Sequence, residues 1–156
     1  MPDPAPTAAA GPRIALAFDF GRRRIGVAAG DTLTATAAPR PAVAAHDGVP
    51  DWSAVAREIR ALAPHVLIVG VPYNADGSDG STAQAARDFG VQLHERFALP
   101  VEHVDEHGSS IEAGRALKEQ RASGQRRRRV QREDIDSAAA AVILTRWLAG
   151  EGDRKS

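Results

Sequence analysis

The sequence contains no cysteine, a single methionine and only two lysines. Without cysteine the chain can form neither disulfide bonds nor a thiolate zinc site. Any bound metal must therefore be held by oxygen ligands or by the five histidines. Since oxygen ligands suit hard divalent cations, the composition favours such a cation over a softer metal.

Excess charge and long apolar runs are also absent. The 20 basic residues balance the 20 acidic residues, which argues against a positive electrostatic potential over the whole surface. No apolar run approaches the roughly 18 residues that cross a membrane. Residues 1–12 lack the charged start and apolar centre of a signal peptide. We therefore expect a cytoplasmic protein with no membrane partner and a disordered extension at 1–12.

A chain of 156 residues has the length of one ordinary domain. We expect that domain at residues 13–149 and a flexible tail at 150–156. Strand-like runs come first, and strands then alternate with helical periodicity. This order predicts an α/β fold with a mixed five-stranded sheet, whose first three strands are antiparallel, and with helices on both faces. The predicted strands are 14–20, 25–29, 34–45, 65–72 and 99–106, and the predicted helices are 51–64, 81–97, 109–117 and 134–150.

The first predicted strand, IALAFDF, contains one acid among apolar residues. Because side chains alternate along a strand, Leu16 and Phe18 share one face, whereas Ala17 and Asp19 share the other. Burying a carboxylate is costly unless it is paired, hydrogen-bonded or bound to a metal. Asp19 therefore either binds the amides of the turn that follows or faces a cation, and this stretch alone leaves both open.

Two further acids are placed to meet Asp19. Glu106 ends a predicted strand, at the edge where open α/β sheets bind ligands. Asp136 lies in the first turn of the last predicted helix, on the same side as Ala139, Ala140 and Ile143. An acid that only stabilises the N-terminus of the helix would occupy the same position. Close carboxylates could not all ionise cheaply without a cation. The three acids therefore predict a site for Mg²⁺ or Mn²⁺, with two ions as in phosphodiester hydrolysis.

The basic residues are concentrated in residues 121–132, RASGQRRRRVQR, which hold six arginines and no acid. Such a run is commonly a solvated loop, but it is also typical of a phosphate-binding segment. The loop lies between Glu106 and Asp136 in the sequence, so we expect it to lie close to the predicted metal site.

Four segments together resemble the YqgF/RuvX family of bacterial RNase H-like proteins, which comprises Holliday junction resolvases and nucleases that mature pre-16S rRNA. The segments are AFDFGRRRIGVAAGD, LIVGVPYNADGSDGS, VDE and RRRRVQREDIDSAAAAVIL, in the family's order and spacing. The resemblance covers residues 14–148. It implies an RNase H-like fold in which Asp19, Glu106 and Asp136 are metal-binding catalytic acids.

Candidate nucleic-acid contacts follow from the basic turn, the Gly/Asp-rich loop and the arginine run. They are Arg22, Arg23, Arg24, Asn74, His107, Arg126, Arg127, Arg128 and Arg129. The chain departs from the family at His107 and Gly108, where the family has arginine and an apolar residue. His107 can replace that arginine at a phosphate only when it is protonated, so the departure bears on activity more than on fold.

These features favour a metal-dependent endonuclease acting on structured RNA, the 5′ end of pre-16S rRNA, in association with the ribosome. Cleavage of branched DNA is the nearest alternative, because neither basic segment carries a base-reading signature. A non-catalytic RNA-binding module of the same fold is a second alternative. An actin-like or sugar-kinase ATPase would need two such domains, and the length argues against it. The sequence leaves monomer and homodimer open.

Overall fold

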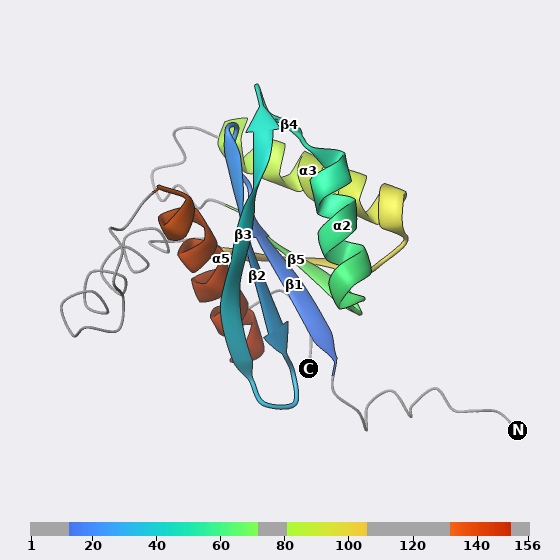
Figure 1. Ribbon diagram of the computed structural model, residues 1–156, viewed down its shortest axis with the longest axis vertical. Helices are drawn as coiled ribbons and strands as arrows, with labels where there is room; N and C mark the ends of the chain where they lie inside the picture. Colours follow the sequence, from blue (N-terminus) through green and yellow to red (C-terminus); the bar gives the residue numbers. More distant parts are fainter. Residues whose placement is uncertain (1–12, 72–80, 106–131, 151–156) are drawn as a thin grey trace, which may run out of the picture.

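The computed structural model describes residues 13–71, 81–105 and 132–150 (Figure 1). Its strands are β1 (Ile14–Asp19), β2 (Arg24–Asp31), β3 (Thr36–His46), β4 (Val49–Pro50), β5 (Val66–Val71) and β6 (Val101–Asp105). Its helices are α2 (Trp52–Leu62), α3 (Ser81–Phe97) and α5 (Arg132–Leu148). The helix predicted at 109–117, residues 121–131 of the arginine run and both chain ends lie outside the described residues, so the predicted domain limits remain predictions. In the described part of the chain no helix is long and apolar enough to span a membrane.

The strands form one mixed sheet in the order β4-β3-β2-β1-β5-β6. Strands β1 to β4 pair in antiparallel fashion, and β5 and β6 run parallel to β1. The predicted class, an α/β fold with an antiparallel first half, is confirmed. The parallel half places the carboxyl ends of β1, β5 and β6 at one edge of the sheet, where ligands bind in such folds.

The predicted count of five strands was wrong, because the two-residue β4 pairs with the end of β3. Asp47 and Gly48 join them, with φ angles of 50° and 83°. Two positive φ values are typical of the tight hairpin turn that Asp-Gly favours, so the dipeptide was the missed signal. Strand β3 continues through Pro39 and Pro41, as the predicted strand 34–45 requires. In the described part of the chain, β4 covers the outer side of β3 only at Ala45 and His46, so Pro39 and Pro41 lie on an uncovered edge, where prolines are tolerated.

Helices cover both faces of the sheet (Figure 1). Leu16 and Phe18 of β1 pack in the core under α2 and α3, whereas Ala15 and Ala17 pack in the core under α5. The alternation predicted for β1 is therefore confirmed. Because the face under α5 carries small residues, that helix can lie close to the sheet.

The face under α2 and α3 is filled by aromatic rings. The Phe89 ring of α3 lies 5.5 Å from that of Phe18, 5.2 Å from that of Phe20 and 5.7 Å from that of Trp52, measured between centroids. These four aromatic residues therefore pack together in the core. Helix α2 begins after its N-cap Asp51, whose carboxylate accepts a hydrogen bond from the amide of Ala54 at 3.2 Å.

Candidate active site

Asp19 is the last residue of β1 and is buried, with 9% of its surface exposed. It follows the parity of Ala15 and Ala17, so it belongs to the face covered by α5. Its register partners are Gly26 on β2 and Gly70 on β5. Since both neighbours are glycines, neither adjacent strand places a side chain beside Asp19 at its own level.

The start of α5 touches β2 at Gly26. A Cβ atom on Gly26 would lie 1.9 Å from the carbonyl oxygen of Asp136 and 2.9 Å from the amide nitrogen of Ser137. Only glycine permits this approach. Because Gly26 is also the register partner of Asp19, the contact brings the second turn of α5 beside the end of β1. Asp19 and Asp136, which the sequence predicts to meet, come from adjoining backbone segments.

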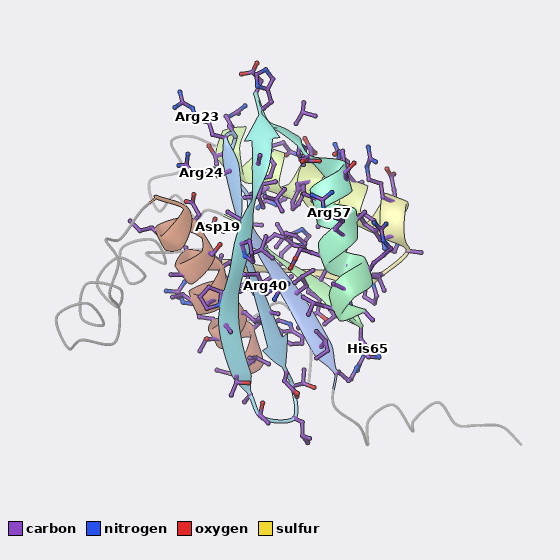
Figure 2. All side chains as sticks on the ribbon, in the orientation of Figure 1. Asp19, Arg23, Arg24, Arg40, Arg57 and His65 are labelled. Atoms are coloured by element: carbon purple, nitrogen blue, oxygen red, sulfur yellow. The ribbon has the colours of Figure 1, made fainter. Side chains whose placement is uncertain are left out.

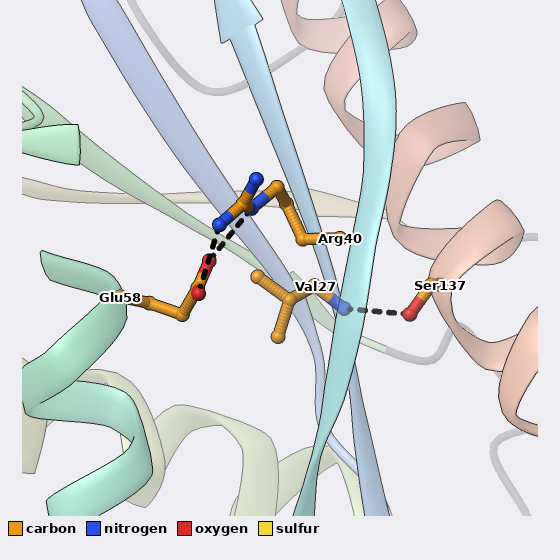
Figure 3. Close-up of polar contacts among 4 residues, drawn as sticks. All are labelled: Val27, Arg40, Glu58 and Ser137. Atoms are coloured by element: carbon orange, nitrogen blue, oxygen red, sulfur yellow. Dashed lines mark hydrogen bonds and ion pairs between the residues drawn. The ribbon is translucent and has the colours of Figure 1, made fainter. Parts of the chain in front are cut away.

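A hydrogen bond next to this contact holds the same turn of α5. The buried Ser137 hydroxyl accepts from the amide of Val27 at 3.4 Å (Figure 3). Sequence reasoning missed Gly26 and Ser137 as positioning residues. A glycine inside a strand was the available signal, since it often marks a close approach of another backbone.

Arg24, the first residue of β2, forms an ion pair with Asp136. Its Nε donates to Asp136 Oδ2 at 2.6 Å, and the two side chains are 31% and 27% exposed. In Figure 2, Asp19, Arg23 and Arg24 lie at the same end of the sheet. Arg24 was predicted to contact nucleic acid, and in this structure its guanidinium is held by an acid of the candidate site.

The other two arginines of the turn, Arg22 and Arg23, are exposed. Their backbone is fixed to the following hairpin, because the carbonyl of Arg23 accepts from the amide of Ala45 at 2.9 Å and that of Arg22 accepts from Gly48 at 3.0 Å. Two cationic side chains are therefore presented to solvent from an anchored turn, next to the buried Asp19.

The remaining predicted site residues lie outside the described residues: Asn74, Glu106, His107, Arg126, Arg127, Arg128 and Arg129. The register still constrains where the chain leaves β6. Asp19 is level with Gly70, and Val71 is level with Asp105, the last residue of β6. Among the described residues no cluster of three or more potential metal ligands occurs. The described part of the predicted site therefore consists of Asp19 and Asp136. The third predicted acid, Glu106, directly follows β6 and lies outside the described residues.

A separate pocket of about 200 Å³ opens on the other side of the end of β1. It is lined by Phe20 and Arg22 and by Asp88 and Gln92 of α3, among others. Neither Asp19 nor Asp136 lines it. The two acids therefore form a site on the α5 side of the sheet, distinct from this hollow.

Solved structures of the same fold include Holliday junction resolvases. RuvC of T. thermophilus in complex with Holliday junction substrate aligns over 89% of this chain and 95% of that chain, with a TM-score of 0.52 and 15% identity. A second Thermus thermophilus RuvC structure aligns with a TM-score of 0.50 and 14% identity, over 89% of this chain and 98% of that chain. At these identities the likeness establishes the RNase H-like fold.

Relatives cover most of the chain at much higher identity. Proteins named "Putative pre-16S rRNA nuclease" occur in Legionella pneumophila (strain Paris), 45% identical over 85% of this chain and 93% of theirs, and in Nitrosococcus oceani, 46% identical over 88% and 87%. The family model described as "RuvX: Holliday junction resolvase" matches residues 13–150. This chain therefore belongs to the RuvX family, a family of enzymes that hydrolyse phosphodiester bonds.

Proposed function

We propose that this protein is a metal-dependent endonuclease whose substrate is the precursor of 16S rRNA, cut at its 5′ end in the cytoplasm in association with the ribosome. The observation that carries the proposal is the approach of α5 to Gly26, which brings Asp136 to the strand end that holds Asp19. The relatives' names supply the substrate.

The described acids fit a hard divalent cation. Both are carboxylates on the same side of the sheet, the donor type that Mg²⁺ and Mn²⁺ prefer. Asp136 already binds a cationic group, the Arg24 guanidinium, which shows that this position accommodates positive charge. We assign Asp19, Asp136 and Glu106 as the residues that would hold the ions. When bound, two ions supply activation of the attacking water and stabilisation of the leaving oxygen.

The arginines supply substrate attraction. Arg22 and Arg23 are exposed on the anchored turn, and we propose that they and Arg126 to Arg129 bind backbone phosphates. Arginine suits this role because its planar guanidinium makes paired hydrogen bonds to phosphate oxygens. Such contacts position a substrate without reading its sequence, so the fold of the RNA rather than its bases would select the cleavage site.

Branched DNA is the second candidate substrate, because the matching family model is described as a Holliday junction resolvase. Cleavage of a labelled pre-rRNA 5′ leader and of a labelled four-way DNA junction, each with Mg²⁺, Mn²⁺ or EDTA, separates the two. We expect cutting of the RNA that requires the metal. Exclusive cutting of the junction would replace the rRNA substrate, and cutting in EDTA would refute the metal requirement.

The variant Asp19→Asn tests the site in the same assay, with Asp31→Asn as its matched control. Asp31 ends the other strand of the same hairpin, at its far end, and accepts a hydrogen bond from the amide of Leu33 at 2.7 Å. We expect Asp19→Asn to abolish cleavage and Asp31→Asn to retain it. RNA binding without cleavage by the unaltered protein would instead support a non-catalytic module.

A further inference from the structure

The ion pair between Arg24 and Asp136 has a counterpart on the other side of the sheet. Arg40 of β3 binds Glu58 of α2 through Nε at 2.9 Å and Nη2 at 3.1 Å (Figure 3). Both pairs join a strand arginine to a helix carboxylate, and both are partly exposed. What distinguishes the first pair is its surroundings, because the backbone of Asp136 packs against Gly26, the register partner of a second acid, Asp19, at the end of β1.

Because of this second acid, Arg24 does more than hold α5 on β2. Two ionised carboxylates brought together at the edge of a sheet repel each other, and the repulsion is strongest where solvent is partly excluded. Asp19 is buried and Asp136 is about three-quarters buried, with 27% of its side chain exposed. A cation on Asp136 Oδ2 lowers this repulsion, which is also what a divalent ion between the two acids would do.

We propose that Arg24 is a stand-in cation: its guanidinium occupies Asp136 Oδ2 in the metal-free protein, and the divalent ion displaces it when the site is loaded. The proposal rests on the proposed function, since it needs the metal site at Asp19 and Asp136. It makes Arg24 a positioning residue, one that keeps the start of α5 in place on β2 until the ion takes over the same oxygen.

The proposal predicts competition between Arg24 and the metal. Replacing the guanidinium by a neutral amide removes the competing charge, so Arg24→Gln should bind Mn²⁺ more tightly than the unaltered protein. We expect a gain of roughly two- to fivefold in affinity, the range for a partly exposed ion pair. Arg24→Lys keeps the positive charge and should bind Mn²⁺ with nearly the original affinity.

The test is titration of the full-length protein with Mn²⁺ alone, by calorimetry and without nucleic acid, together with thermal unfolding in EDTA and in saturating Mn²⁺. Arg24→Gln should unfold at a lower temperature in EDTA, and Mn²⁺ should close that gap because the ion takes the place of the guanidinium. Arg40→Gln is the matched control. It should lower the unfolding temperature by the same amount in both conditions and leave Mn²⁺ affinity unchanged.

The results for Arg24→Gln distinguish a cation that the metal displaces from a purely structural ion pair. Equal or weaker Mn²⁺ binding by Arg24→Gln, or a stability loss that Mn²⁺ does not reduce, overturns the inference and leaves Arg24 a structural tether. An Arg24→Gln protein that folds only with Mn²⁺ supports it, and one that folds in neither condition overturns it. If the unaltered protein shows no Mn²⁺ binding that Asp19→Asn removes, the metal-dependent function itself fails, and the inference fails with it.

Discussion

Gly26→Ala tests the close approach on which the site depends. The added Cβ would lie 1.9 Å from the Asp136 carbonyl oxygen, whereas ordinary contacts begin at 3.4 Å, so the backbones of β2 and α5 must separate by about 1.5 Å. The obstacle is backbone, which cannot rotate away as a side chain would. We therefore place the cost at the upper end for overpacking, about 3 kcal/mol.

That cost corresponds to a fall in unfolding temperature of about 6–12 °C for a domain of this size. The same shift moves Asp136 away from Asp19, and a misplacement of about 1 Å can cost roughly 100-fold in rate. Thermal unfolding and single-turnover cleavage measure the two effects. Both are expected in the same variant, because one contact controls packing and the site.

Gly90→Ala is the control for Gly26→Ala. Its Cβ would meet only side-chain atoms, His103 Nε2 at 3.0 Å and Val101 Cγ1 at 3.4 Å, and alanine favours a helix more than glycine does. We expect an unfolding temperature equal to or above that of the unaltered protein. If Gly26→Ala also unfolds at the unaltered temperature and cleaves at the full rate, α5 does not rest on Gly26 and the proposed geometry is wrong.

Two further predictions concern the arginine run and α2. Replacing Arg126 to Arg129 by serine should flatten the dependence of log K for single-stranded RNA binding on log salt, by about 0.7 for each phosphate that the variant no longer neutralises; an unchanged slope would show a solvated loop that does not bind phosphate. Asp51→Ala removes the carboxylate that caps α2 and should cost about 1 kcal/mol in denaturant unfolding. Asp51→Ser restores a capping oxygen and should recover most of that stability, and equal stability of all three proteins would contradict the capping role.

Local patterns predicted most of the fold because each depends on nearby residues. Alternation in β1 identified its two faces, and the apolar run at 66–71 identified the buried strand β5. The cap of α2 and the stop of α5 at Gly150, where φ is 88°, follow from single residue types. The two-residue β4 was missed because its pairing depends on a turn rather than on a periodic run.

The site could be predicted only in outline. The type of each acid and its place at the end of a strand or the start of a helix indicated that Asp19 and Asp136 would converge. The partner of Asp136 could not be predicted, since Arg24 lies 112 residues away in the sequence. Their meeting depends on how closely α5 packs on β2, which is set by the absence of a side chain at Gly26.

The proposed function requires Asp19 and Asp136 to act as one metal site, and a double-mutant cycle tests this requirement. Single-turnover cleavage in Mn²⁺ would be compared for Asp19→Asn, Asp136→Asn and the double variant. Residues that act as a unit show strongly non-additive effects on rate. We predict that the double variant cleaves at about the rate of the slower single variant. A rate reduction equal to the product of the two single reductions would show that the acids act independently, and it would contradict the shared site.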